Sequence, residues 1–248
     1  MGKKIRLDKL LVDRGLAASR QRAQEMISAG VVKVNGLVAS KASTQVPTDR
    51  PVIIEEPDHP WVSRGALKLL GALESFPSID CHGAVCADLG SSTGGFTEVL
   101  LERGAQRVYA VDVGTKLLHY RLREHPRIVM MEGTNARNLQ SLPEPIDLIV
   151  GDLSFISFTL ILPTVKRLLR TGGQAVVLVK PQFEAGRENV ARGGVVRDPI
   201  ARAAAIERVR SGSIEAGFEV LGSADSAVAG AKKGNIEHFL HLRRLTAT

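Results

Sequence analysis

The stretch ADLGSSTGGFTEVLLERGAQRVYAVDVG, residues 87–114, decides the fold of most of the chain. An apolar run over 84–89 leads into a glycine-rich loop, a helical pattern follows over 95–104, and a second apolar run over 107–113 contains Asp112. A strand, a glycine loop, a helix and a second strand open the doubly wound sheets that hold a nucleotide-type cofactor at that loop. The stretch therefore predicts an α/β domain with its cofactor site after the first strand.

The spacing of the loop narrows the choice of cofactor. It reads Gly90-x-x-x-Gly94-Gly95, which is neither G-x-G-x-x-G nor the GK[ST] loop that cradles phosphates. Asp112 lies 112 − 90 = 22 residues beyond Gly90, where an acid can accept both hydroxyls of a ribose. A ribose and adenine without a pyrophosphate favour S-adenosylmethionine (SAM), and an NAD enzyme with an unusual loop is the alternative. The expected cofactor-binding residues are Gly90, Ser91, Ser92, Thr93, Gly94, Gly95, Phe96, Asp112, Asn135 and Asp152.

From residue 63 onward strand and helix patterns alternate, which indicates a parallel sheet covered by helices on both faces. The first helix, over 63–76, places Leu67, Leu70 and Leu73 on one face. Two successive strands close the chain and predict a terminal hairpin with one reversed strand, so that the sheet has seven strands. The expected strands are 84–89, 107–113, 127–132, 147–153, 174–180, 218–228 and 235–244, and further helices are expected from about Thr115, over 156–170 and over 199–216.

The positive charge of the chain is concentrated at its beginning. Lysine and arginine number 33 and acids 26, a net charge of +7 over 248 residues. Residues 1–48 hold nine bases and three acids, 9 − 3 = +6, which leaves 24 − 23 = +1 for the rest. A small basic module ahead of a near-neutral body predicts binding to a polyanion such as nucleic acid, and a merely soluble basic surface is the plain alternative.

Within this basic module, a helix is expected over 7–14 and a second after Ser19, a plausible N-cap, with Gly30 as its stop. Asn35-Gly36 is a strong hairpin turn signal. The run RLDKLLVDRGLAASRQRAQEMISAGVVKVNG resembles the RNA-binding fold of ribosomal protein S-four over about residues 5–50. The resemblance implies contacts with structured RNA, and the expected RNA-binding residues are Arg6, Lys9, Arg14, Arg20, Arg22, Lys33 and Lys41. The expected divisions are an RNA-binding domain over 1–58, a linker over 59–62 and the α/β domain over 63–248.

Four polar residues occupy places where a purely structural reading expects few. Lys68 interrupts an apolar helix, Asp152 and Lys180 end two sheet strands, and Glu237 lies in the last strand. Each alone has a plain explanation, such as a snorkelling lysine or a strand-end charge. Together they are expected to converge on one edge of the sheet, beside the cofactor crevice.

With these features the chain resembles the hemolysin A / TlyA ribosomal RNA methyltransferases, which share an FtsJ-type ribose methyltransferase domain. The motifs that carry the resemblance are SRGALKL, DLGSSTGGFT, GDLSFIS, VKPQFE, GGVVRDP and GNIEHFL, and they cover nearly the whole chain. The resemblance implies a class I SAM-dependent methyltransferase fold and a catalytic tetrad of Lys68, Asp152, Lys180 and Glu237. It also implies methylation of a ribose 2′-hydroxyl, with cytidine as the nucleoside, in ribosomal RNA or ribosomal subunits.

The chemistry suits these residue types. A ribose hydroxyl is a weak acid that loses its proton as it attacks the methyl group, and a lysine can stabilise the alkoxide or accept the proton. Lys180 is expected to be the central group, with Lys68 and Asp152 around it and Glu237 orienting Lys68 or the ribose. Alignment of oxygen, carbon and sulfur supplies much of the rate.

Further features of the sequence concern its location, its cysteines and the competing functions. The chain opens without a signal peptide, and Asp147, Asp152 and Pro163 break its most apolar window, so we expect a cytoplasmic protein without a membrane span. Cys81 and Cys86 are expected as buried thiols, with no metal site and no obligate protein partner. A base methyltransferase, a non-catalytic assembly factor and a membrane-lytic protein are the competing classes. The segment 186–198 is either a lid over RNA or an ordinary surface loop.

Overall fold

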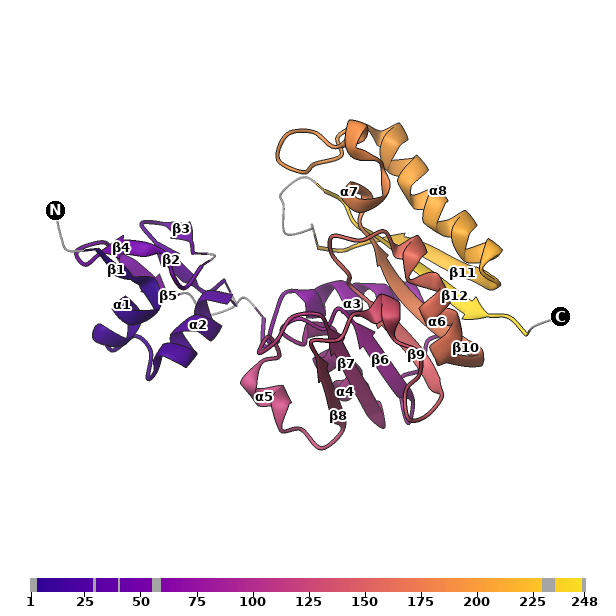
Figure 1. Cartoon of the computed structure of the whole chain (residues 1–248), viewed down its shortest axis with the longest axis horizontal. Helices are drawn as coiled ribbons and strands as arrows, with labels where there is room; N and C mark the ends of the chain where they lie inside the picture. Colours follow the sequence, from indigo (N-terminus) through magenta and orange to yellow (C-terminus); the bar gives the residue numbers. More distant parts are fainter. Residues whose placement is uncertain (1–3, 29, 40, 55–58, 229–234, 247–248) are drawn as a thin grey trace. The chain divides into compact units, whose positions relative to one another are not determined.

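A computed structural model describes residues 4–28, 30–39, 41–54, 59–228 and 235–246, without the side chains of Glu25 and Ser28. The chain divides into two compact units, Met1–Ser63 and Arg64–Thr248 (Figure 1). Each unit has its own buried apolar cluster, so each is described by itself.

The N-terminal unit packs two helices against short antiparallel strands. Its core contains Leu7, Leu11, Ala23 and Val32, all buried. The Oγ of Ser19 accepts from the backbone of Arg22 at 3.1 Å, which confirms the predicted N-cap. Asn35 and Gly36 both have positive φ, as the hairpin turn between β2 and β3 requires. The elements are β1 (Lys4–Arg6), α1 (Leu7–Asp13), α2 (Arg20–Ser28), β2 (Val32–Val34), β3 (Leu37–Val38), β4 (Gln45–Pro47) and β5 (Val52–Ile54).

The larger unit is built on a seven-stranded sheet with the order β11-β12-β10-β9-β6-β7-β8. β12 runs antiparallel to both of its neighbours, while the pairs among β8, β7, β6, β9 and β10 are parallel. The predicted α/β class with one reversed terminal strand is therefore confirmed. The strands are β6 (Val85–Leu89), β7 (Arg107–Asp112), β8 (Ile128–Glu132), β9 (Ile146–Gly151), β10 (Leu169–Val179), β11 (Phe218–Asp225) and β12 (His238–Arg244).

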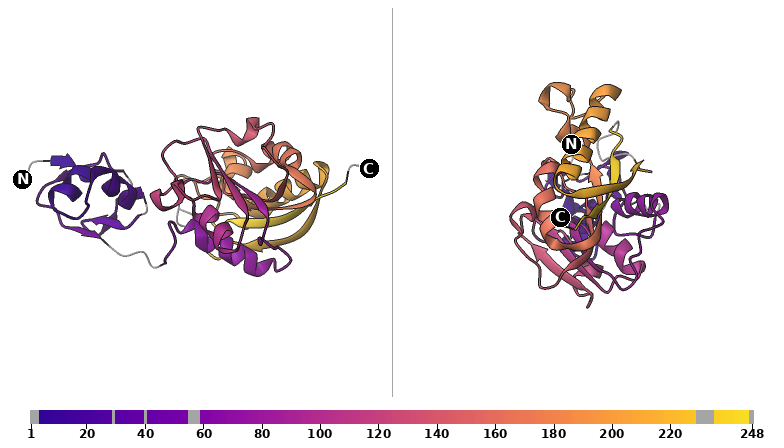
Figure 2. Two further views of the ribbon diagram at one scale, coloured as in Figure 1. Left: turned by 90° about the horizontal axis from the view of Figure 1, so that it is seen from below. Right: turned by 90° about the vertical axis from the view of Figure 1, so that its right-hand side faces the viewer.

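Helices cover both faces of this sheet. The helices α3 and α4 pack against each other on one face, and Figure 2 shows α6 and α8 on the other. The sheet is buried because each central strand is a continuous apolar run, which is the pattern of strands covered on both sides. The helices and 3-10 turns are α3 (Gly65–Ser75), α4 (Gly95–Glu102), α5 (Tyr120–Arg123), η1 (Ala136–Asn138), η2 (Phe158–Leu160), α6 (Leu162–Leu168), α7 (Pro181–Glu184), η3 (Arg187–Asn189) and α8 (Pro199–Glu215).

Three local predictions are wrong: two concern the extent of helices, and one concerns the buried face of α3. No helix begins near Thr115: the carboxylate of Glu132 accepts from the backbone of Lys116 and Leu117 and holds that stretch as a loop. The helix expected over 156–170 is split into η2 and α6, and its last two residues begin β10.

The face of α3 is also misassigned. The buried residues are Ala66, Leu69, Ala72 and Leu73, while Leu67 and Leu70 are only half-buried. A run of leucines on nearly every side of the helix left the period ambiguous, and the small alanines decide which face approaches the sheet.

Candidate active site

The loop after β6 brings backbone close to the neighbouring strand ends. Gly90 has φ +87°, and a Cβ at this position would lie 2.8 Å from the carbonyl oxygen of Asp152. Gly94, at φ +95°, N-caps α4, and a Cβ there would clash with Leu118 and Leu122. Only glycine fits both positions without strain, so this loop is shaped for a close approach of backbone.

The end of β7 carries a carboxylate that organises the same loop. Asp112 Oδ2 accepts from the backbone nitrogen of Ser92 at 2.8 Å, and Oδ1 accepts from that of Gly114 at 2.7 Å. Each carboxylate oxygen has a second lone pair, so Asp112 can still accept from the hydroxyls of a ribose.

A cavity of about 480 Å³ lies at the carboxyl ends of these strands. This volume is in the range of pockets for small ligands. Of the ten residues predicted to bind the cofactor, five line it: Gly90, Ser92, Asp112, Asn135 and Asp152. Val113, Leu117, Leu153 and Phe155 add apolar walls that the sequence did not single out.

The other five predicted residues do not line this cavity: Ser91, Thr93, Gly94, Gly95 and Phe96. They form the loop and the first turn of α4. Phe96 is 3% exposed, and its ring centroid lies 6.3 Å from that of Phe239, so it packs in the core. Its role in the geometry is to anchor the loop rather than to face the cavity.

Two lysines and two acids meet beside the cavity. Lys68 Nζ lies 2.6 Å from Glu237 Oε2 and 3.6 Å from Asp152 Oδ2. Lys180 Nζ lies 2.5 Å from Asp152 Oδ1, a close charge pair rather than a well-aligned hydrogen bond. The four residues come from α3, from the residue after β9, from the residue after β10 and from the residue before β12. The structure thus brings together side chains separated by up to 237 − 68 = 169 residues.

The burial of this tetrad is unusual for charged groups. The side chain of Glu237 is 3% exposed and that of Lys180 is 10% exposed, whereas Asp152 is 20% exposed. Buried charges are stable in a fold only when paired, and here two positive groups face two negative ones. The cluster is dry on the Glu237 side and reaches solvent at Asp152, where a substrate can enter.

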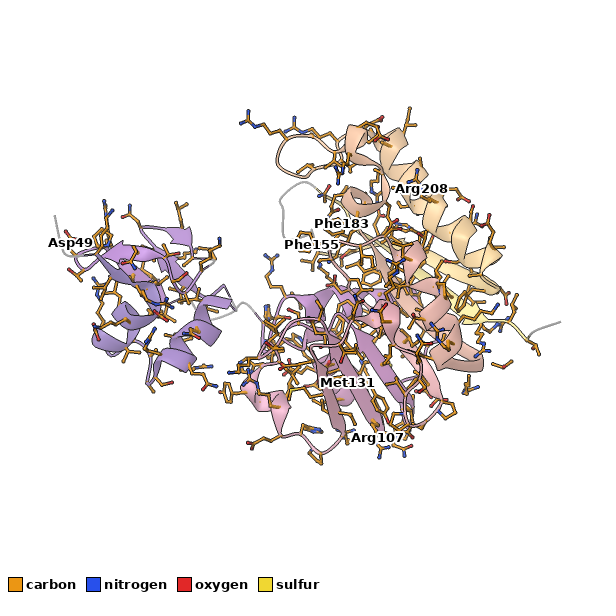
Figure 3. The ribbon with its side chains drawn as sticks, viewed as in Figure 1. Asp49, Arg107, Met131, Phe155, Phe183 and Arg208 are labelled. Atoms are coloured by element: carbon orange, nitrogen blue, oxygen red, sulfur yellow. The ribbon has the colours of Figure 1, made fainter. Side chains whose placement is uncertain are left out.

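The loop after β9 supplies residues that sequence reasoning missed. Ser154 Oγ accepts from Lys180 Nζ at 2.7 Å. Phe155 is 90% exposed in a left-handed conformation, and its ring lies beside that of Phe183, centroids 5.4 Å apart (Figure 3). The only available signal was their place two and three residues after a strand-end acid.

Glu184 fixes the loop after β9 through hydrogen bonds. Its carboxylate accepts from Ser157 Oγ at 2.6 Å and from the backbone nitrogen of Phe158 at 2.7 Å. Burial raises the pKa of Glu184 above its ordinary value. Because Glu184 lies on α7, directly after Lys180, it joins the loop of Ser154 to the strand end of Lys180. Arg208 of α8, labelled in Figure 3, holds the same turn by donating to the carbonyl oxygen of Glu184.

Asp88, the penultimate residue of β6, is another buried acid. It is 0% exposed, and Thr97 Oγ1 donates to its Oδ2 at 2.7 Å. Its Oδ1 has no hydrogen-bond partner among the described residues. Burial raises the pKa of Asp88 to about 7, with a further contribution from the nearby negative charge of Asp152.

The N-terminal unit presents the predicted RNA-binding side chains at its surface. Asp8 is fully buried and accepts from Arg6 at 2.9 and 3.0 Å and from Arg20 at 3.1 Å. Hydrogen bonds from Arg6 hold the pKa of Asp8 well below its usual range. Arg14 donates to the carbonyl oxygen of Thr48. The side chains of Lys9, Arg14, Arg20, Arg22 and Lys41 are exposed, and those of Arg6 and Lys33 are half-buried.

Three further features concern possible metal ligands, the two cysteines and membrane-spanning helices. Within the described residues, no group of three or more His, Cys, Asp or Glu side chains is placed to hold a metal ion. Cys81 and Cys86 are free and buried, as predicted, and burial raises the pKa of Cys81 to about 11. Among the described segments, none of the helices has the length and apolarity needed to cross a membrane.

Fold and site together define a class I SAM-dependent methyltransferase. Residues 61–244 match the FtsJ-like methyltransferase family and residues 5–50 match the S4 domain. The chain belongs to the FtsJ-like methyltransferases and, within them, to the hemolysin A / TlyA family that its motifs indicated. Its cofactor is SAM, and the cavity, with Gly90 in its wall and an acid at the end of β7, fits the ribose and adenine of that molecule.

Two relatives match nearly the full chain, and a more distant structure shares the fold over most of it. The chain is 47% identical to the "16S/23S rRNA (cytidine-2'-O)-methyltransferase TlyA" of Mycobacterium tuberculosis, over 99% of this chain and 92% of the relative. A solved structure titled "Putative hemolysin from Streptococcus thermophilus" is 38% identical, with a TM-score of 0.75 over 100% of this chain and 90% of that one. An S-adenosylmethionine dependent methyltransferase from Mesorhizobium loti, 18% identical, shares the fold, with a TM-score of 0.54 over 70% of this chain and 96% of that one.

Proposed function

We propose that this protein transfers the methyl group of SAM to the 2′-hydroxyl of a cytidine ribose in ribosomal RNA. The observation that carries the proposal is the paired tetrad of Lys68, Asp152, Lys180 and Glu237 beside the cofactor cavity. The relative from Mycobacterium tuberculosis is named for this reaction on cytidine, which supports the choice of nucleoside. Bound SAM supplies an electrophilic methyl group.

The residues of the chain act on the attacking hydroxyl. Lys180 Nζ is held by Asp152 at 2.5 Å and by Ser154 at 2.7 Å, at the end of β10 where the cavity opens. A lysine there stabilises the ribose oxygen as it loses its proton, or accepts that proton. Glu237 fixes the ammonium group of Lys68, which in turn faces Asp152. The pair of Glu237 and Lys68 therefore helps to position the pair of Asp152 and Lys180.

Lys180→Arg separates the two roles of the lysine. Arginine stabilises an alkoxide but cannot accept a proton near neutral pH. Substantial residual transfer with a changed pH profile would support electrostatic stabilisation, whereas loss as complete as in Lys180→Ala would support proton acceptance.

The proposed RNA substrate also fits the apolar surface of the site. The exposed ring of Phe155, next to Phe183, is a surface on which an unstacked nucleobase can lie. In the N-terminal unit, the exposed bases are proposed to hold phosphates of structured ribosomal RNA, with the ribosomal subunits of the cytoplasm as the partner. Phosphate contacts fix position rather than sequence, so this unit would dock the enzyme on structured RNA while the tetrad performs the transfer.

The test uses SAM carrying a tritiated methyl group and unmodified ribosomal subunits, with free ribosomal RNA in a parallel arm. We expect label in RNA, resistant to alkaline cleavage at one cytidine, and none with Lys180→Ala. Label found only in protein or small molecules would overturn the proposal. Release of a dye from liposomes at the same protein concentration, without RNA labelling, would favour the lytic alternative.

A further inference from the structure

The segment 186–198, here called the arginine hairpin, carries charges that nothing in the proposed site uses. Arg187, Arg192 and Arg197 are all exposed. Their side chains form neither an ion pair nor a hydrogen bond with any residue that the structure describes, in contrast to Arg202 and Arg208 of the neighbouring helix. Of the two acids in the hairpin, Asp198 is engaged as the N-cap of α8, and Glu188 accepts from Asn189.

The hairpin has a defined shape of its own. Ala191 and Val195 form an antiparallel bridge, and the turn between them uses Gly193 at φ +100° and Gly194 at φ +81°. Val196 is 6% exposed and packs in a cluster with Ala185, Ala201 and Ala205. The guanidinium groups are therefore carried by ordered backbone, which lowers the entropy lost when they bind a ligand.

A buried side chain ties this hairpin to the catalytic edge of the sheet. Asn235, 2% exposed, accepts from the backbone nitrogen of Val196 at 3.0 Å and donates to the carbonyl oxygen of Gly194 at 2.8 Å. Asn235 precedes Glu237 by two residues, and Arg202 holds the carbonyl oxygen of Ile236 between them at 3.1 Å. The other end of the hairpin follows α7 and Lys180. The N-terminal arm of the hairpin is thus joined to Lys180 through α7, and its C-terminal arm is joined to the strand of Glu237 through the hydrogen bonds of Asn235.

We propose that the arginine hairpin binds the sugar–phosphate backbone of the RNA strand that flanks the methylated ribose, and that Asn235 is the positioning residue that holds it there. The inference rests on the proposed function and adds a second RNA surface, distinct from the N-terminal unit. Arginine suits this role because its planar fork matches a phosphate, and phosphate contacts set the register of a strand. Free guanidinium groups on a fixed frame are available to a polyanion without first breaking internal ion pairs.

The first experiment removes the three charges together. The variant Arg187→Gln, Arg192→Gln, Arg197→Gln is compared with a control variant, Arg103→Gln, Lys166→Gln, Arg210→Gln. The control removes the same charge from exposed sites at the C-cap of α4, on α6 and on α8. The probe is ribosomal RNA transcribed in vitro, hence unmodified, and affinity is measured by filter binding over a series of salt concentrations.

We expect the hairpin variant to lose about 100-fold in affinity at 0.1 M salt, and the slope of log K against log salt to fall by about two, since three phosphate contacts are lost. The control variant should stay within about fivefold of wild type. SAM affinity, measured by calorimetry, should be unchanged in both. Equal RNA affinity and slope in the hairpin and control variants would overturn the proposal.

The second experiment tests the role of Asn235. Asn235→Ala should lower RNA affinity about tenfold in the wild-type background but less than twofold when the three arginines are already absent. Equal losses in both backgrounds would mean that Asn235 does not act through the hairpin. Circular dichroism and SAM affinity monitor folding, and Asn235→Ser, which keeps a small acceptor, serves as the second variant.

The two proposals fail in different ways. If RNA affinity depends on the three arginines but the wild type transfers no methyl group, the proposed reaction is wrong and the RNA-binding role of the hairpin stands. If the wild type transfers methyl groups but its RNA affinity does not depend on the three arginines, the proposed role of the hairpin is wrong and the proposed reaction stands.

Discussion

The carboxyl edge of the sheet has two halves that are built from different materials. At the ends of β6, β7 and β8, backbone groups dominate: glycines at positive φ allow close approach, and Asp112 and Glu132 accept from loop amides. At the ends of β9 and β10 and the start of β12, charged side chains dominate, in the tetrad of two lysines and two acids.

The contrast teaches how cofactor affinity and reaction rate are separated in one crevice. A cofactor that must be bound and released needs mainly a fitting shape and groups that form hydrogen bonds with it. A reaction that develops charge needs groups that are charged and already in place. Changes in the first half should therefore act mainly on SAM affinity, and changes in the second half mainly on the rate.

The largest expected effect tests the second half. Lys180→Ala should lower the single-turnover rate of methyl transfer at least about 1000-fold, because the attacking oxygen loses its charge partner. SAM affinity should stay within a few-fold. Lys166→Ala, an exposed lysine of α6, is the matched control and should retain the wild-type rate. A Lys180→Ala enzyme at wild-type rate would exclude Lys180 as the central group.

Gly90 lies against Asp152, where the two halves meet, so a change there should affect both SAM affinity and rate. In Gly90→Ala, the new Cβ would meet the carbonyl oxygen of Asp152 at 2.8 Å, at a φ of +87°. We expect SAM affinity to fall about 100-fold, and the rate at saturating SAM to fall as well because Asp152 is displaced. Gly83→Ala, with positive φ but open space around it, separates backbone strain from the clash. Identical behaviour of the two variants would remove the argument from close approach.

A smaller effect should be confined to the first half. Asp112→Asn keeps the size of the side chain but loses the charge and half of its acceptors, so we expect SAM affinity to fall about tenfold. The rate at saturating SAM should stay within a few-fold, because the hydrogen bonds of Asp112 go to the backbone of Ser92 and Gly114 and not to the tetrad. A large fall in that rate with unchanged affinity would contradict the division.

Sequence reasoning reached the frame of the site but missed the groups that support it. Lys68, Asp152, Lys180 and Glu237 do come together, because the carboxyl ends of parallel strands share one edge; their catalytic role stays a prediction. Ser154 and Glu184 were missed, since a serine in a loop and a glutamate on a one-turn helix carry no period, and their partners lie far along the chain. The loop after β7 was misread for the same reason, because Glu132 holds it from the next strand.

The last expected effect is on stability rather than on affinity or rate, and it concerns Asp88, buried behind the cofactor loop. Its pKa is raised to about 7 in the folded chain, so folding favours the protonated form. The contribution is fully present below about pH 4 and is lost as pH rises through 7. Asp88→Asn is neutral at every pH, so between pH 5 and 8 wild-type stability should fall by about 2 kcal/mol more than that of the variant. Thermal melts of both proteins across this window, with Thr97 left intact to donate to either side chain, measure the difference. Parallel pH curves would show that Asp88 is ionised in the folded state, and that this half of the site holds a buried negative charge after all.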